Sequence, residues 1–351
     1  MSRTKRKLDH INHALSSKIV NTNGLEDITF VHQSFPETSL NSISIESEYN
    51  ILKLGAPLFI NAMTGGGGKA TEGINAQLAE IANSLHIPIA VGSQMAALKD
   101  NSQRASYEIV RKNNPRGLVF ANVGSEATID EALACVEMLE ADALQIHMNT
   151  IQELVMPEGD RDFKGALSHI GKIVEKLHIP VIVKEVGFGM SRETAEKLLE
   201  NGVECLDTGG KGGTNFSLIE NARREKQLPF FDEWGISTAA SLVEVKAAGV
   251  PHIAASGGIK TSEDIAKAIA LGGDMCGMAG QVLKWLQQSG QQAAHENLEN
   301  VLSELKIIMT ALGAKNISEL QRVPLIISGD TYHWLQERGN STKHFAGRTI
   351  K

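Results

Sequence analysis

The hydrophobic residues of this chain recur in short runs. Most runs are followed by glycine, serine or asparagine and then by a segment of helical spacing. Near-continuous apolar runs, without polar alternation, are typical of parallel strands that are buried on both faces. The pattern therefore predicts eight strands, at 57–63, 87–93, 118–124, 143–149, 180–186, 205–210, 252–258 and 275–280.

The segments between these strands predict helices. Ser191 and Thr261 are expected to cap two of them, and Asn201-Gly202 is expected to end one. Eight β–α units of this length fit a (β/α)8 TIM barrel. An open doubly wound sheet also alternates strands and helices, but it usually carries G-x-G-x-x-G after its first strand, and that motif is absent here. The predicted helices lie at 75–85, 128–139, 163–177, 192–201 and 262–271.

We expect a single domain over 1–351, with the barrel core at about 55–290. An N-terminal extension covers 1–50, and C-terminal helices and a tail cover 291–351. The polar stretch from Ser328 is either a tail or an added cover over the barrel. An apolar stripe after residue 281 predicts exposed helices and therefore a homo-oligomer, either a tetramer or an octamer. The stripe consists of Val282, Leu283, Leu286, Leu298, Val301, Leu302, Leu305 and Ile308.

Composition excludes several classes of protein. Hydrophobic residues make up 42% and charged residues 21%, as in ordinary globular proteins, and the net charge of −7 argues against a nucleic-acid partner. No apolar window is long enough to span a membrane, and the basic N-terminus lacks the apolar run of a secretory signal. Cys135, Cys205 and Cys276 form no metal-spaced pair, which predicts reduced thiols in a cytoplasmic protein.

The carboxyl ends of the predicted strands carry the candidate chemistry, because barrels build their active sites there. The sixth strand runs into a loop at 207–217, where four glycines bracket Lys211. Glycine lets the backbone approach a ligand, and exposed N–H groups bind anions. The segments at 256–261 and 279–281 are suited to a second phosphate contact at a helix N-terminus. Together they predict an extended phosphorylated ligand.

Lys184 ends the fifth strand, within an otherwise apolar run. An ammonium group is costly to bury without an anionic neighbour. Two hypotheses follow. Either Lys184 pairs with a carboxylate of the core, or it faces the electron-rich part of a cofactor.

These features resemble one known family over nearly the whole chain, from Arg6 to about Gly313. The chain is similar to type 2 isopentenyl-diphosphate isomerase, a flavin-dependent enzyme built on an FMN-binding barrel. It departs from the pattern at Met95, where some relatives carry a basic residue. The matching segments are 6–11, 59–66, 91–94, 147–149, 152–153, 157–161, 184–191, 207–216 and Trp234-Gly235.

The resemblance implies interconversion of isopentenyl and dimethylallyl diphosphate, with FMN and Mg²⁺ bound. FMN must be reduced, and NADPH is the usual reductant. The flavin contacts implied by position are Ala62, Met63, Thr64, Ser93, Asn122, Lys184, Thr214, Gly257, Gly258, Ala279 and Gly280.

The resemblance also implies the residues that bind substrate and metal. Glu153 would bind Mg²⁺, a hard ion that prefers oxygen ligands. Without the resemblance, the basic N-terminus would be interpreted as a solvated segment. The implied substrate contacts are Arg6, Lys7, His10, Ser93, Gln94, His147, Asn149 and Gln152.

For proton transfer, the N5 region of the flavin is the first candidate, and His147, Gln152 and Glu233 are the candidate catalytic side chains. Gln152 would serve as a relay, since an amide is a poor acid. Glu233 would complete a proton path, or would be an exposed carboxylate on a loop. Lys211 would either add positive charge to the phosphate site or only order its loop.

Three other functions remain as alternatives. A 2-hydroxy-acid oxidase barrel would need a histidine base and an arginine near the sixth or seventh strand, and 207–213 contains neither. A barrel resembling inosine-monophosphate dehydrogenase would need a cysteine in the sixth loop, whereas Cys205 precedes it. A non-catalytic flavin- or phosphate-binding barrel is disfavoured by the density of polar strand ends.

Overall fold

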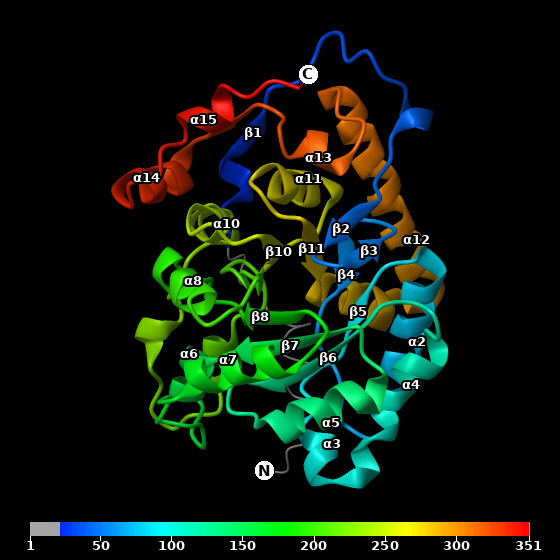
Figure 1. Cartoon of the computed structure of the whole chain (residues 1–351), viewed down its shortest axis with the longest axis vertical. Coiled ribbons are helices and arrows are strands. Elements are labelled where there is room, and N and C mark those ends of the chain that lie inside the picture. Colours follow the sequence, from blue (N-terminus) through cyan, green and yellow to red (C-terminus); the bar gives the residue numbers. More distant parts are fainter. Residues whose placement is uncertain (1–21, 351) are drawn as a thin grey trace.

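The computed structural model describes residues 22–350, so Arg6, Lys7 and His10 lie outside the described residues. Eight parallel strands form a closed barrel, in which β4 pairs with β11 (Figure 1). This confirms the predicted (β/α)8 barrel over the open sheet, and each predicted strand is present. The strands are β4 (Leu58–Ile60), β5 (Ile89–Ala90), β6 (Val119–Gly124), β7 (Ala143–Met148), β8 (Val181–Glu185), β9 (Cys205–Asp207), β10 (His252–Ser256) and β11 (Met275–Met278).

Helices follow the strands and surround the barrel (Figure 1). Ser191 and Thr261 accept hydrogen bonds from the first turns of their helices, as predicted for N-caps. Short helices α3 (Met95–Lys99), α6 (Thr150–Val155) and α9 (Phe216–Asn221) are inserted after β5, β7 and β9. The main outer helices are α2 (Lys69–Leu85), α4 (Ala105–Asn113), α5 (Ile129–Leu139), α7 (Ala166–Lys176), α8 (Arg192–Leu199), α10 (Thr238–Ala247), α11 (Ser262–Ala270) and α12 (Gly280–Leu312).

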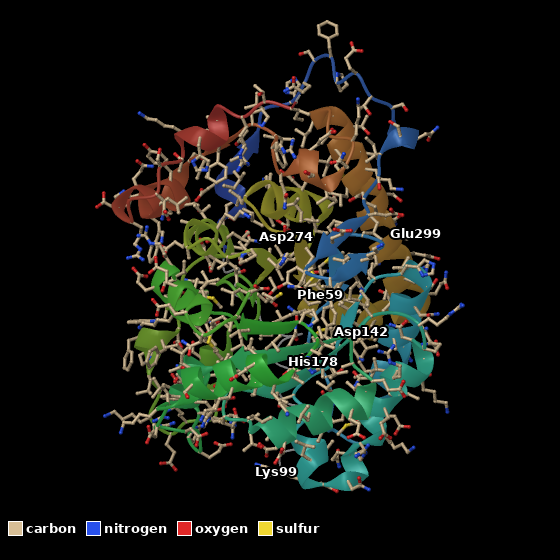
Figure 2. All side chains as sticks on the ribbon, in the orientation of Figure 1. Phe59, Lys99, Asp142, His178, Asp274 and Glu299 are labelled. Atoms are coloured by element: carbon tan, nitrogen blue, oxygen red, sulfur yellow. The ribbon has the colours of Figure 1, made fainter. Side chains whose placement is uncertain are left out.

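One buried apolar residue from each strand forms a layer inside the barrel, which we call the lower layer. Phe59, labelled near the middle of the molecule in Figure 2, belongs to it and is fully buried. The hairpin of β2 (Ser47–Tyr49) and β3 (Leu52–Leu54) adds Tyr49, whose hydroxyl donates to Leu206 O at 3.3 Å. The lower layer consists of Phe59, Ala90, Phe120, Ala143, Ile182, Cys205, Ala254 and Met275.

A second layer lies two residues further along each strand. Side chains alternate between the two faces of a strand, so these residues project from the same face as the lower layer. Here the residues are polar or glycine, and the polar ones are buried. We call them the upper layer: Asn61, Gly92, Asn122, Gln145, Lys184, Asp207, Ser256 and Gly277.

The two ends of the described chain pack together. Strand β1 (Ile28–Phe30) pairs antiparallel with β12 (Leu325–Ile327), followed by α14 (Gly329–Glu337) and α15 (Lys343–Ala346) (Figure 1). Trp334 Nε1 donates to the buried Glu244 of α10 at 2.8 Å, and Arg338 Nε donates to the same carboxylate at 2.9 Å. Of the two predictions for the stretch after Ser328, the cover is therefore correct and the tail is wrong.

The prediction of exposed apolar stripes after residue 281 is wrong. Val282, Leu298 and Leu305 are fully buried within the chain, and Leu302 and Ile308 pack partly buried against the same core. The apolar face of α12 is covered by the barrel helices, among them α11 and α2. The homo-oligomer remains a prediction, but this stripe no longer supports it.

The three cysteines are buried and unpaired by disulfides, as predicted. Burial raises the pKa of the Cys135 and Cys205 thiols to about 12, which keeps them protonated and unreactive. Within residues 22–350, no helix has the length and apolar character needed to cross a membrane.

Candidate active site

The upper layer is held by hydrogen bonds between side chains of four strands and the residue after β4. Asp207 Oδ2 accepts from Asn61 Nδ2 at 2.9 Å, and Asp207 Oδ1 accepts from Ser256 Oγ at 2.5 Å and from Gly209 N at 3.1 Å. Asn61 Oδ1 accepts from Gln145 Nε2 at 3.2 Å. Buried polar groups need such partners, so the layer is an ordered polar floor at the carboxyl ends of the strands.

His147 and Asn122 continue this floor. Asn122 Nδ2 donates to Gln145 Oε1 at 3.1 Å, and Asn122 Oδ1 lies 2.9 Å from His147 Nδ1. The backbone N–H of Asn122 donates to Gln94 Oε1 at 2.9 Å. The structure thus brings two residues together that the sequence predicted separately, one for flavin and one for substrate.

Lys184 is buried in the upper layer and pairs in register with His147 of β7 and Asp207 of β9. Its Nζ donates to the backbone oxygen of Glu185 at 2.9 Å, and no ion pair involving it is found among the described residues. Glu185 Oε2 instead accepts from Gly187 N at 2.8 Å and Phe188 N at 2.6 Å. Burial raises the pKa of Glu185 to about 7, while those N–H groups and Lys184 oppose the rise. This arrangement favours Lys184 as a cation kept for a ligand.

The loops after β9, β10 and β11 meet at one place. A Cβ on Gly213 would lie 2.8 Å from Gly258 N, and a Cβ on Gly280 would lie 3.9 Å from Thr214 Oγ1. Gly257 and Gly258 have φ of 108° and 76°, so glycine is needed at both. Helix α12 begins here at Gly280, with Ala279 at its N-cap position and no side chain capping its first N–H groups. Close backbones, a hydroxyl and an uncapped helix N-terminus fit a phosphate group, as the sequence predicted.

The loops after β4 and β5 are interlocked. Thr64 is buried, its hydroxyl donates to Asn75, and its backbone oxygen accepts from Gly92 N at 2.9 Å. The Tyr107 hydroxyl donates to Ser93 O at 2.6 Å. Ala62 and Met63 lie half-buried between these contacts. Two of the residues predicted to contact the flavin, Thr64 and Ser93, therefore lie in loops that are held to each other by hydrogen bonds.

Gln94 does not suit its predicted role in substrate binding. Its side chain is fully buried, and its Nε2 donates to Cys135 O of α5 at 3.0 Å and to Met138 Sδ at 3.4 Å. Its Oε1 accepts from Asn122 N. The amide thus anchors α5 to β6. A glutamine whose donors are both used inside the protein cannot donate to a diphosphate, so the geometry corrects this expectation.

Gln152, on α6, contacts a carboxylate that the sequence prediction missed. Its Nε2 donates to Glu220 Oε1 at 3.2 Å, and Glu220 is fully buried on α9. Arg223, one turn later, donates to Glu220 and to Glu158. The available signal was the spacing of Glu220 and Arg223, three positions apart at the end of α9, because residues three apart on a helical turn share a face.

Glu233, the predicted end of the proton path, is 77% exposed at its side chain and accepts from Lys211 Nζ at 3.0 Å. Of its two predictions, the exposed loop carboxylate is the one that matches. Lys211 also donates to Glu233 O at 2.8 Å, and its backbone N–H donates to Ile236 O at 2.8 Å. Lys211 therefore ties the glycine-rich loop to the segment before α10, in keeping with its expected ordering role.

Glu153 is half-buried beside Gln152 on α6. Its Oε1 accepts from Asn149 Nδ2 at 2.9 Å, and its Oε2 accepts from Asp160 N at 2.9 Å. Within residues 22–350, no group of three metal-binding side chains is found. A magnesium ion here would have Glu153 as its protein ligand and would take other oxygens from a phosphate, which is common for Mg²⁺.

Comparison with known proteins shows the family of the chain. Residues 99–326 match the family model of FMN-dependent dehydrogenases. The chain is 55% identical over 349 residues to an isopentenyl-diphosphate delta-isomerase of Geobacillus sp. (strain WCH70), covering 99% of this chain and 100% of that protein. It is 57% identical over 340 residues to the isopentenyl-diphosphate delta-isomerase of Bacillus licheniformis, covering 97% of each.

The chain belongs to the isopentenyl-diphosphate delta-isomerase family. Its barrel is that of the FMN-dependent dehydrogenases, which confirms the resemblance noted in the sequence.

Solved structures of low sequence identity share the fold of this isomerase-family chain. The Pediococcus acidilactici lactate oxidase superposes with a TM-score of 0.67 at 14% identity, covering 93% of each chain. A flavocytochrome b2 variant gives a TM-score of 0.67 at 17% identity, covering 93% of this chain and 80% of the other. At such identities the likeness concerns the barrel alone.

Proposed function

We propose that this chain interconverts isopentenyl diphosphate and dimethylallyl diphosphate, with reduced FMN bound at the mouth of the barrel. Full-length similarity to relatives named for this activity carries the proposal. The site adds independent support, because its phosphate-sized cradle and its buried lysine fit a flavin nucleotide. NADPH is the proposed external reductant, and Mg²⁺ the proposed metal.

The cradle of Thr214, Gly257, Gly258, Ala279 and Gly280 would hold the FMN phosphate through backbone N–H groups and the helix N-terminus. Lys184 would lie against the polar edge of the ring system, where its charge stabilises an electron-rich ring. The wall of Ala62, Met63, Thr64, Ser93 and Asn122 would line the ring.

The substrate diphosphate would bind across the opposite side of the site. Glu153 would reach it through Mg²⁺, and Asn149 holds that carboxylate in place. Protonated on both ring nitrogens, His147 would donate to a phosphate oxygen. Arg6, Lys7 and His10 would supply further positive charge and donors, since arginine and lysine are the usual phosphate partners.

The reaction adds one proton at one end of the three-carbon allylic unit of the substrate and removes one from the other end, with no net change in electrons. When bound, reduced FMN supplies a basic, electron-rich ring beside the substrate alkene. Gln152 would orient a proton or a water molecule at the reacting carbon. Glu220 fixes the Gln152 amide by accepting from its Nε2, and Arg223 in turn holds the Glu220 carboxylate.

The first test combines an absorption spectrum with an isomerase assay on the full-length protein. The expected protein is yellow, is bleached by NADPH or dithionite, and converts isopentenyl diphosphate only when reduced and supplied with Mg²⁺. NADPH should not be consumed in proportion to turnover. A protein that binds no FMN, or that oxidises 2-hydroxy acids instead, contradicts the proposal.

Gln152→Asn tests the proton path. The shorter side chain keeps the amide but withdraws it from Glu220 and from the substrate, so kcat should fall about 10²-fold, the usual scale for one group in proton transfer. FMN affinity should stay unchanged, because Gln152 contacts none of the cradle residues. Gln321→Asn, which alters an amide bound to Gly273 O and Asp274, is the matched control. An unaltered kcat in Gln152→Asn removes this residue from the mechanism.

We also propose a homo-oligomer, a tetramer or an octamer, in the cytoplasm. Light scattering of the purified protein gives the molar mass directly, and a monomer of 37.8 kDa would contradict the oligomer.

A further inference from the structure

A continuous chain of five polar side chains runs through the upper layer and ends at His147, two residues beyond Gln145 on β7. We call it the amide relay: Asp207, Asn61, Gln145, Asn122 and His147. Its links measure 2.9, 3.2, 3.1 and 2.9 Å. The first four members are almost completely buried, with exposures of 0–4%. Water therefore cannot substitute for a missing partner, and each link needs one donor and one acceptor.

The direction of the relay is fixed by groups that cannot turn over. An amide oxygen and nitrogen exchange places when the side chain flips, so the amides alone leave the direction open. The backbone N–H of Ala62, however, donates to Asn61 Oδ1 at 2.7 Å, and a backbone N–H can only donate. Asn61 must therefore turn its Nδ2 toward Asp207, whose carboxylate can accept it.

The remaining links follow in order. Since Asn61 Oδ1 accepts, Gln145 must offer it Nε2 and turn Oε1 toward Asn122. Asn122 must then offer Nδ2 to Gln145, which leaves its Oδ1 facing His147 Nδ1. An amide oxygen only accepts. Nδ1 of His147 must accordingly carry a hydrogen.

We propose that the amide relay locks His147 in the tautomer protonated at Nδ1, so that Nε2 is the ring nitrogen that exchanges a proton. Asp207, Asn61 and Gln145 are then positioning residues, which act on His147 through Asn122 and touch neither ligand. The protonated state of the second ring nitrogen decides whether a histidine donates or accepts. For the ligand contact, this inference rests on the proposed function, in which His147 meets the substrate diphosphate.

The tautomer is measured by nitrogen NMR on the full-length, FMN-loaded protein labelled with ¹⁵N-histidine. The signal of His147 is assigned by its loss in His147→Asn. In the wild type, the neutral ring should show its hydrogen on Nδ1. A hydrogen on Nε2 overturns the proposal, whatever reaction the protein catalyses.

Three variants identify the relay as the cause. Gln145→Met removes the acceptor of Asn122 at similar side-chain volume, so a second tautomer should appear. Gln145→Glu keeps an oxygen for Asn122 Nδ2 and should preserve the Nδ1 tautomer. Gln321→Met, the same change at an amide bound to Gly273 and Asp274, should have no effect. If Gln145→Met shows only the Nδ1 tautomer, the amide relay is not what fixes the tautomer of His147. If that variant fails to fold, the wild-type spectrum still shows which ring nitrogen carries the hydrogen.

Kinetics give the functional arm of the test. In Gln145→Met, Asn122 no longer holds the His147 ring in one orientation, so the hydrogen bond from the protonated ring to the diphosphate should weaken. Such a bond to a charged ligand is worth about tenfold in affinity, so KM for isopentenyl diphosphate should rise by about that factor. The kcat and the flavin absorbance should change little. A fall in kcat with unchanged KM contradicts positioning for the diphosphate. If the wild type lacks isomerase activity, the proposed function fails, and the NMR result still decides the tautomer.

Discussion

The lower and upper layers of the barrel come from the same strands, two residues apart, and they do different work. Phe120 and Asn122 illustrate this, because both are buried and project from the same face of β6. The lower layer has no polar side chain with unmet hydrogen bonds and can pack as densely as any core. In the upper layer, the buried side chains are hydrogen-bond donors and acceptors that pair with one another. We therefore expect the stability of the fold to depend mainly on the lower layer, and ligand binding to depend on the upper layer.

The largest effect is expected in the lower layer. Phe120→Ala removes a fully buried ring that packs against Phe59 at a centroid distance of 5.9 Å. The free energy of unfolding should fall by about 3–5 kcal/mol, from lost transfer energy and the cavity left behind. Chemical denaturation measures it, with the 85%-exposed Phe35→Ala as a control that should change little. A loss below 1 kcal/mol in Phe120→Ala would contradict the view that the lower layer supplies most of the stability.

Glu185 is the residue after Lys184 of the upper layer and ends β8. Its substitution should give the next largest effect. Its pKa is about 7 in the folded protein against an ordinary 4.5. Between these two pH values the folded state holds a proton that the unfolded chain has lost, so the stability of the fold decreases as pH rises. Glu185→Gln removes this loss and should stabilise the protein by about 1–3 kcal/mol above pH 7.

The Glu185→Gln gain should vanish below pH 4.5, where the carboxyl is protonated in both states. Thermal unfolding at several pH values measures the difference between variant and wild type. A difference that is constant with pH contradicts the raised pKa.

Lys184→Met tests the upper layer directly. The substitution keeps the length of the side chain but removes its charge, so the Kd for FMN should rise about tenfold, the value of one charge-assisted hydrogen bond. Stability should be unchanged or higher, because a buried ammonium is costly. Flavin fluorescence measures the affinity. The control is Lys267→Met, at a buried lysine of α11 that pairs with Glu263. Equal FMN affinity in both variants would contradict the proposed role of Lys184.

Ser256→Ala should give the smallest effect. It removes one of the donors to Asp207, which keeps those of Asn61 and Gly209. The expected loss is about 1 kcal/mol of stability, with FMN affinity and the tautomer of His147 unchanged. Denaturation, flavin titration and NMR check the three parts. A much larger loss would mean that Asp207 depends on this single hydroxyl.

The sequence alone determined the barrel. Parallel strands that are buried on both faces are mostly apolar, so eight runs of this kind, separated by capped helices, specify eight β–α units. It also predicted the close approach of two backbones at the carboxyl ends of the strands, because Gly210, Gly212, Gly213, Gly257 and Gly258 are needed there. The sequence also indicates which side chains share a face of a strand. In Phe120-Ala121-Asn122, the apolar ring and the amide are two positions apart and therefore project to the same side.

Only the tertiary structure decided which of these residues act together. Glu220 was missed, and Glu233 was preferred, because Gln152 and Glu220 are 68 positions apart and meet only when α6 packs against α9. Gln94 was misjudged because a glutamine beside a strand end looks the same in sequence whether it faces the site or α5. The apolar stripe of α12 gave no sign of whether its own barrel or a second copy would cover it. Hydrogen-bond direction and burial depend on partners brought together by the fold, and local pattern does not contain them.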